Sequence, residues 1–290
     1  MKSRLILAAL VAILLPGAAC RAQVEVEARK IADAYKDTVV TVDLVVDIKM
    51  SYEGQSNKRE QKHSTTATII DPDGLAVASL TQVSPDSYRD PNDASANDTT
   101  FDIKDVKIRL ADGTEIPADV VLRDRDLDLA FIRPKTKPAQ PLPYVDLTKS
   151  STPQLLDQVL VLSRLGQLAN HALSARLDRI ESVVTKPRTF YIIDGTLHQE
   201  LGIPVFTLDS KCVGILVVRL NMSSASSGQE RMYLSVLPCS TLATVAQQAK
   251  TAQPEVRVEP EPAPESQPKP VVKQPTKPAT KAPAKPKKTP

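Results

Sequence analysis

Residues 67–80 read ATIIDPDGLAVASL, two short apolar runs around Asp71-Pro72-Asp73-Gly74. Aspartate, proline and glycine favour a tight turn, because proline fixes φ, aspartate bonds to nearby backbone and glycine tolerates a positive φ. The alternation of strand-forming runs with this turn predicts a β-hairpin. The stretch therefore indicates that the chain folds through antiparallel strands.

The neighbouring segments repeat the pattern. VVTVDLVVDIKM (39–50) alternates apolar and polar residues, which is typical of a half-buried strand. DVKIRLADGTEIPADVVLRD (105–124) predicts a second hairpin around Asp112-Gly113. Further short apolar runs follow: LDLAFIRP (127–134), QVLVLSRL (158–165), TFYIID (189–194), IPVFTL (203–208), CVGILVVRL (212–220) and MYLSVL (232–237). Many short strands with turn signals between them predict an all-β sandwich or a pair of barrels.

Helices are expected only at the edges of this region. EVEARKIADAYKD (25–37) predicts a short N-terminal helix, and a C-terminal helix is expected from Ser240, which would be its N-cap. The polar stretch between Ser84 and Thr100 is expected to be an irregular loop.

Both ends of the chain differ from the folded part. Residues 1–22 combine Lys2 and Arg4 with a short apolar run and small residues, which predicts a signal peptide and hence export to the periplasm, cell envelope or exterior. Two alternatives follow: cleavage that releases a soluble protein, or lipid attachment at Cys20. Residues 251–290 contain 11 prolines and predict a disordered, extended tail.

Charge argues against nucleic acid as a partner. The whole chain has a net charge of +3. Removing the three basic residues of 1–22 and the tail, with eight basic and four acidic residues, leaves −4 for residues 23–250. Nucleic-acid-binding domains usually carry a basic patch. The lysine-rich end of the tail is either part of a spacer or a contact for an anionic envelope surface.

The cysteines and histidines do not form a metal-binding motif. His63, His171 and His198 are scattered, and the sequence has no CxxC or HxxxH spacing, so we expect neither a metal site nor a cofactor. Cys212 and Cys239 leave two alternatives in an oxidising compartment, a disulfide or two buried thiols.

The order of these segments resembles the HtrA-type (DegP-like) serine proteases of the trypsin fold. The hairpin 67–80, the segment VKIRLADGTEIPADVVLRDRDLDLAFIRP (106–134) and YLSVLPCSTLATVAQQ (233–248) resemble landmarks of that family, and the similarity covers about residues 28–249. It implies a trypsin-like double β-barrel over 23–250, with barrels at roughly 35–140 and 150–238.

The resemblance also places the catalytic positions. Asp128 corresponds to the family's catalytic aspartate, whereas Thr81 lies at the histidine position and Leu201 at the serine position. Serine-protease chemistry requires a hydroxyl nucleophile and an imidazole base. Threonine is no base near neutral pH, and leucine has no nucleophilic atom. No intact catalytic residue is therefore expected.

These positions favour a catalytically inactive protease homologue that binds or scaffolds extended peptides or envelope proteins. The alternative is an active HtrA-type serine endopeptidase whose triad is unrecognised, with His198, Ser79 and Ser174 as candidates. Asp128 is then either catalytic or a structural carboxylate that accepts hydrogen bonds from a loop. The ligand and the oligomeric state are not determined by the sequence.

Overall fold

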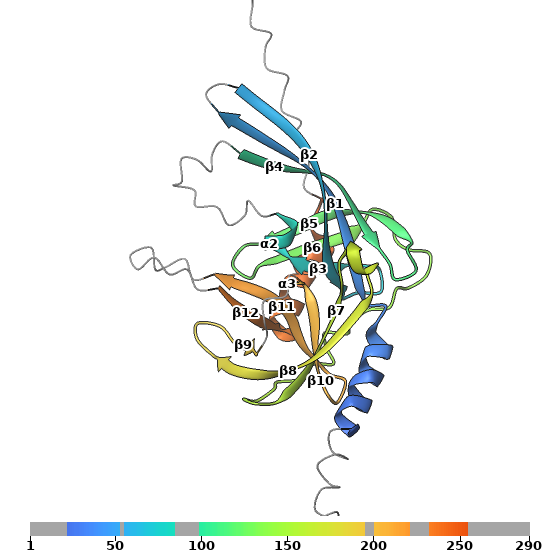
Figure 1. Cartoon of the computed structure of the whole chain (residues 1–290), viewed down its shortest axis with the longest axis vertical. Coiled ribbons are helices and arrows are strands. Elements are labelled where there is room, and N and C mark those ends of the chain that lie inside the picture. The colour runs from blue at the N-terminus through green and yellow to red at the C-terminus, as the bar shows by residue number, and fades with distance from the viewer. Residues whose placement is uncertain (1–21, 53–54, 85–98, 195–199, 221–231, 255–290) are drawn as a thin grey trace, which may run out of the picture. The chain divides into compact units, whose positions relative to one another are not determined.

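The strands of the chain close into two six-stranded antiparallel barrels (Figure 1). The computed structural model describes residues 22–52, 55–84, 99–194, 200–220 and 232–254. The predicted all-β double barrel of the trypsin type, with a helix at each end, is confirmed. The signal peptide and Cys20, nearly all of the predicted loop 84–100, His198 and the tail beyond residue 254 lie outside the described residues.

The first barrel has the strand order β1-β2-β3-β6-β5-β4. Its strands are β1 (Val39–Tyr52), β2 (Gln55–Ile69), β3 (Ala76–Ser79), β4 (Thr99–Arg109), β5 (Glu115–Asp124) and β6 (Leu129–Pro134). The inward face of β1 carries Val40, Val42 and Leu44, all buried as the alternation predicts. The turn predicted at 71–74 is also present, since the Gly74 N–H donates to the Asp71 carbonyl at 2.9 Å and Gly74 has a φ of 90°.

The second barrel repeats this arrangement in the order β10-β11-β12-β9-β8-β7. Its strands are β7 (Gln158–Arg164), β8 (Leu173–Val184), β9 (Phe190–Ile193), β10 (Ile203–Thr207), β11 (Cys212–Leu220) and β12 (Met232–Pro238). Leu160, Leu162, Ile180 and Phe206 fill its core. Burial of such side chains contributes about 1.5–3 kcal/mol each.

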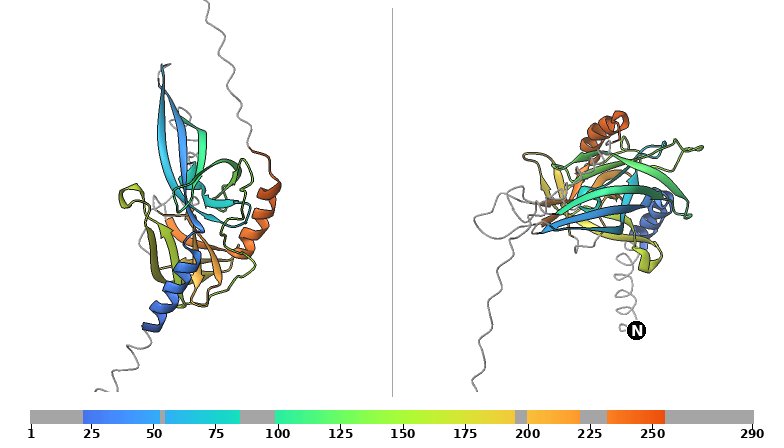
Figure 2. Two further views of the ribbon diagram at one scale, coloured as in Figure 1. Left: turned by 90° about the vertical axis from the view of Figure 1, so that its right-hand side faces the viewer. Right: turned by 90° about the horizontal axis from the view of Figure 1, so that it is seen from above.

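Helices lie at both ends of the described chain, as expected, and also at two internal positions. The N-terminal helix covers 22–35 and packs on the second barrel, where Tyr35 stacks on Phe206 with ring centroids 4.4 Å apart. The closing helix α3 (Cys239–Thr251) lies against the outside of the barrels (Figure 2) and has Pro238, rather than the predicted Ser240, at its N-cap. Two short helices inside the chain, α2 (Leu80–Val83) and η3 (Gln167–Ala169), contradict the prediction that helices occur only at the edges.

The two barrels are joined by apolar packing and by a half-buried arginine. Phe131 of the first barrel, Val217 of the second and Leu242 of α3 belong to one cluster of fully buried side chains. Arg164 of β7 donates to the carbonyl of Val39 at 2.6 Å, to that of Lys36 at 2.8 Å and to that of His171 at 3.2 Å. One guanidinium thus connects the start of β1, the preceding turn and the loop that follows β7.

Candidate functional site: a carboxylate between the barrels

Asp128 lies in the turn between β5 and β6 and is fully buried. The turn forms locally, because the Asp124 carboxylate accepts a hydrogen bond from the Leu127 N–H at 3.0 Å. Asp128 itself has a φ of 57°, a left-handed conformation that aspartate tolerates better than most residues. The turn therefore directs the Asp128 side chain inward, beneath α2 and toward the second barrel.

Four donors converge on the Asp128 carboxylate. The Thr81 N–H and the Thr81 hydroxyl both donate to Oδ1 at 2.8 Å. The Ser79 hydroxyl donates to Oδ2 at 2.6 Å, and the Val218 N–H of β11 donates to Oδ2 at 3.0 Å. Buried carboxylates are stable only when they are paired or hydrogen-bonded, and these four bonds satisfy that requirement.

The geometry explains why α2 begins where it does. The Leu80 N–H donates to the Asp128 carbonyl at 3.0 Å, so side chain and backbone of Asp128 together hold residues 79–81. Leu80 and Val83 are buried on the inner side of this single turn. The first turn of α2 is thus fixed by contacts with a residue that lies 47 positions further along the chain.

Leu201 lies close to α2 from the side of the second barrel. Its side chain is 6% exposed and belongs to the core of that barrel. The Leu201 N–H is 3.4 Å from Gln82 Oε1, and the same oxygen accepts a hydrogen bond from the Thr65 hydroxyl at 2.6 Å. Thr81 and Asp128 are therefore joined by hydrogen bonds. Leu201 contacts Gln82, the residue next to Thr81, through its backbone N–H.

Gly202 fixes the backbone next to Leu201. It has a φ of 73°, and a Cβ at this position would lie 2.7 Å from Ala78 Cα and 2.9 Å from the Ser79 N. Its carbonyl accepts from the Thr68 hydroxyl at 2.8 Å, and its N–H donates to the Leu216 carbonyl at 2.8 Å. Only glycine fits this close approach of the two barrels.

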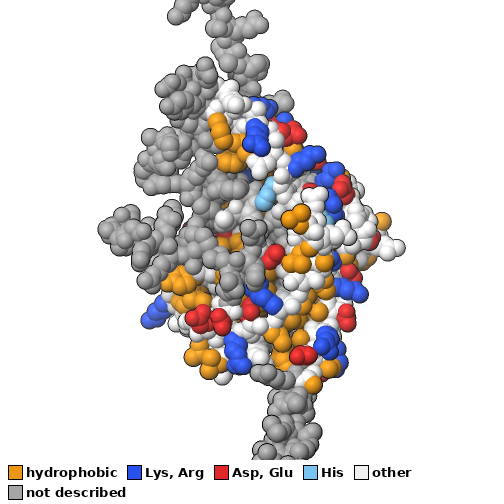
Figure 3. All heavy atoms as spheres, viewed as in Figure 1, with side chains coloured by type: hydrophobic (Ala, Val, Ile, Leu, Met, Phe, Trp, Pro, Cys, Tyr) orange, Lys and Arg blue, Asp and Glu red, His pale blue; other side chains and the backbone are white. Residues whose placement is uncertain are grey.

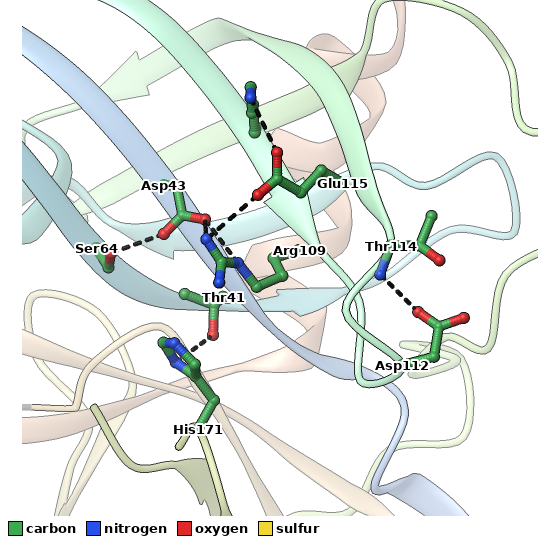
Figure 4. Close-up of polar contacts among 9 residues, drawn as sticks. Thr41, Asp43, Ser64, Arg109, Asp112, Thr114, Glu115 and His171 are labelled. Atoms are coloured by element: carbon green, nitrogen blue, oxygen red, sulfur yellow. Dashed lines mark hydrogen bonds and ion pairs between the residues drawn. The ribbon is translucent and has the colours of Figure 1, made fainter. Parts of the chain in front are cut away.

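Two of the three histidines can be placed. His63 is on β2 opposite Leu44. His171 follows η3, and its Nδ1 is 3.3 Å from the Thr41 hydroxyl, at the contact between the barrels (Figure 4). On the neighbouring strand Arg109 forms an ion pair with Asp43 at 2.6 Å. His171 is thus engaged in a contact on β1.

Cys212 and Cys239 are free thiols, so the disulfide considered from the sequence is not formed. Both are buried, and Cys239 Sγ donates to the Cys212 carbonyl at 3.4 Å. The hydrogen bond with Cys239 and complete burial raise the pKa of the Cys212 thiol well above its ordinary value. A thiol that stays protonated is a poor nucleophile and a poor metal ligand.

The described surface carries charges of both signs. Figure 3 shows acidic and basic side chains interspersed over the face that it displays. Among the described residues there is no cluster of three or more His, Cys, Asp or Glu side chains suited to hold a metal ion. No helix within those ranges is long and apolar enough to cross a membrane.

Sequence reasoning placed Thr81, Asp128 and Leu201 but missed two partners. Val218 was expected only to be part of a strand, and nothing in its apolar run signals that its N–H bonds to a carboxylate 90 residues earlier. The role of Gln82 was also missed. A polar side chain two residues after the apolar Leu80, in a stretch that must enter the barrel interface, was the available signal.

The chain is similar to a known domain family and to solved structures. The crystal structure of the apo MamO protease domain from Magnetospirillum magneticum has a TM-score of 0.46 and 14% identity, and the match covers 73% of this chain and 97% of that chain. No curated protein matches the sequence. A family model for the trypsin-like peptidase domain matches residues 65–215, more than half of the 290 residues. The chain belongs to the trypsin-like peptidase domain family.

Proposed function

We propose that the protein is a catalytically inactive, HtrA-type member of this family that is exported and binds extended peptides or proteins. The observation that carries the proposal is the saturation of the Asp128 carboxylate by donors from Ser79, Thr81 and Val218. In an active triad such a carboxylate orients an imidazole, which takes the proton of the nucleophile. Here threonine donates its own N–H and hydroxyl to that oxygen.

The nucleophile position supports the same conclusion. Leu201 has no hydroxyl or thiol, and its side chain is buried in the core of the second barrel. An oxyanion site requires backbone N–H groups directed at the substrate. The Leu201 N–H instead approaches Gln82 Oε1, itself held by Thr65. The Leu201 N–H and the Gln82 side-chain oxygen thus both have hydrogen-bond partners within the protein.

The binding part of the proposal rests on an open strand edge. β10 pairs with β11 between Ile203↔Leu216 and Phe206↔Cys212, whereas β12 pairs with β11 as far as Leu220. Within the described ranges, β11 beyond Leu216 therefore has a strand partner on one side only. Such an edge accepts an extended peptide through backbone hydrogen bonds.

The direction of the backbone groups supports this use of the edge. Leu216 accepts from Gly202 on the open side, and Val218 donates to Asp128 on that side. Because backbone groups of every second residue in a strand face the same edge, those of Leu220 face it as well. With the Leu216 carbonyl and the Val218 N–H already bonded within the protein, the ladder proposed for a peptide consists of the Val218 carbonyl and the backbone groups of Leu220.

The experiment combines an activity test with a binding test on the full mature chain. We expect no cleavage of unfolded casein and no labelling by a fluorophosphonate probe, with an active trypsin-fold protease as positive control. Stoichiometric labelling that is lost on changing one serine would contradict the proposal and favour the alternative, an active endopeptidase with an unrecognised triad.

Binding is measured by fluorescence polarisation with capped, extended peptides. Leu220→Pro removes an N–H on the open edge and is expected to weaken binding, because proline cannot donate to a ladder. Leu220→Ala is the matched control, since it shortens the same side chain and keeps the backbone N–H, and it should bind the peptides as the unmodified chain does. Unchanged peptide binding in a folded Leu220→Pro variant would contradict the proposed edge.

A further inference from the structure

Two arginines flank the open edge of β11, and they come from different parts of the second barrel. Arg219 is the β11 residue between Val218 and Leu220, and Arg188 lies in the turn between β8 and β9. Both contact Asp126 in the turn before β6: Arg219 NH1 donates to the Asp126 carbonyl at 3.2 Å, and Arg188 NH2 is 3.8 Å from the Asp126 carboxylate. The three residues therefore meet beside Asp128, at the proposed peptide edge.

The Arg219 guanidinium is held in place before any ligand arrives. It lies over the Phe190 ring, with its Cζ 5.2 Å from the ring centroid, and donates one N–H to Asp126. A guanidinium has five N–H donors in a rigid fork that matches a carboxylate. A side chain that is already ordered loses less conformational entropy on binding.

The charge around this edge is opposite to that of the folded region as a whole. Residues 123–128, 185–188 and 219 carry five basic and three acidic side chains, a net charge of +2. Residues 23–250 together carry −4. Arg188 and Asp126 have side-chain exposures of 52% and 81%, so both are accessible from solvent. The edge is thus a locally positive site on an acidic domain.

We propose that the β11 edge binds extended protein segments that carry acidic side chains, and that Arg219 and Arg188 recognise the carboxylates. The inference rests on the proposed function, because it requires a peptide at this edge. In an added strand, the residue opposite Arg219 presents its side chain on the same face as Arg219. Residues two positions away lie on that face too, within reach of an arginine from the β8–β9 turn.

The test uses three fluorescent octapeptides capped at both ends, in which threonine alternates with glutamate, glutamine or lysine. The full mature chain is titrated at low salt. We expect the glutamate peptide to bind several-fold more tightly than the glutamine peptide, at about two- to five-fold for each exposed charge pair. The preference should shrink in high salt, because exposed pairs are screened.

Three substitutions should change the affinity for the glutamate peptide, two of them lowering it and one raising it. Arg219→Gln and Arg188→Gln should each lower the affinity for the glutamate peptide and leave that for the glutamine peptide unchanged. Asp126→Asn should raise the affinity for the glutamate peptide, since it removes a carboxylate that competes for Arg188 and keeps the carbonyl that holds Arg219. A variant that merely unfolds would not bind more tightly.

Each remaining outcome overturns a defined part of the inference. Equal binding of the glutamate and glutamine peptides to the unmodified chain refutes acidic selectivity and leaves peptide binding intact. A loss of affinity for all three peptides in Arg219→Gln would mean that the arginine supports the strand edge and does not read charge. Failure of all three peptides to bind the unmodified chain would refute the proposed function as well.

Discussion

Replacing Asp128 with asparagine tests whether this carboxylate is structural. An amide offers one acceptor oxygen, whereas the four donors from Ser79, Thr81 and Val218 need both oxygens. Either orientation of the amide directs its NH₂ group at a backbone N–H, that of Thr81 or that of Val218. One buried N–H then loses its partner, which costs about 1–3 kcal/mol, and the other bonds lose their ionic acceptor. We expect a loss of about 3 kcal/mol in the free energy of unfolding.

Guanidinium denaturation followed by circular dichroism measures this loss. Asp126→Asn is the matched control, because it makes the same chemical change two residues away on a side chain that is 81% exposed. The control should lie within about 0.5 kcal/mol of the unmodified protein. Fitting with a shared slope converts the shift of the midpoint into a free-energy difference.

A small effect would refute the structural role. If Asp128→Asn unfolds within 1 kcal/mol of the unmodified protein, the four hydrogen bonds are not a net contribution to stability. A variant more stable than the unmodified protein would indicate a functional role, since residues kept for activity often lower stability. Either result would restore Asp128 as a candidate for chemistry.

Three further predictions concern the backbone, a salt bridge and the thiols. Gly202→Ala should cost about 3 kcal/mol or more, because it combines a left-handed φ with backbone clashes, whereas Gly113→Ala, with a φ of 88° and no atom within 4 Å of its Cβ, should cost about 1–2 kcal/mol. Burial raises the pKa of Asp71, but hydrogen bonds from Lys250 and a backbone N–H outweigh it and leave this pKa lowered. Asp71→Asn should therefore be less stable than the unmodified protein at neutral pH, and the difference in denaturation midpoint should shrink as the pH falls below about 4. Cys212 and Cys239 should resist Ellman's reagent at pH 8 until guanidinium unfolds the chain, when two additional thiols react.

Each of these predictions has a result that would contradict it. Equal losses for the two alanine variants would mean that the barrels yield at Gly202. A stability difference between Asp71→Asn and the unmodified protein that persists at pH 2 would mean that the ionised carboxylate is not its source. Fast reaction of both buried thiols in the native protein would indicate that the strand carrying Cys212 opens readily.

Local signals in the sequence predicted the elements whose cause is local. The alternation in 39–50 and the turn at Gly74 depend on neighbours a few residues away, and both appear as predicted. The polar residues 56–64 of β2 could not be predicted as a strand, because they are exposed and form one by pairing with β1. Helix α2 is a single turn, too short for a periodic signal, and Asp128 fixes it from a distance.

The residues of the candidate site also fall into two groups, those that the sequence located and those that it did not. Thr81, Asp128 and Leu201 were located because an ordered set of motifs placed them in a known arrangement. Val218 contributes its backbone N–H, and Gln82 contributes its side-chain oxygen. Both roles depend on which strands meet across the two barrels. Such long-range pairing is set by the whole fold and leaves no local pattern in the sequence.

The triple contact of Arg164 has a consequence for motion. Any hinge opening between the barrels would break the hydrogen bonds from this guanidinium to the carbonyls of Val39 and Lys36. Both bonds are charge-assisted, and the one to Val39 is also partly buried. The two barrels should therefore unfold in one cooperative transition and move little relative to each other. A ligand at the β11 edge would then meet Asp126 of the first barrel and Arg219 of the second at a fixed separation.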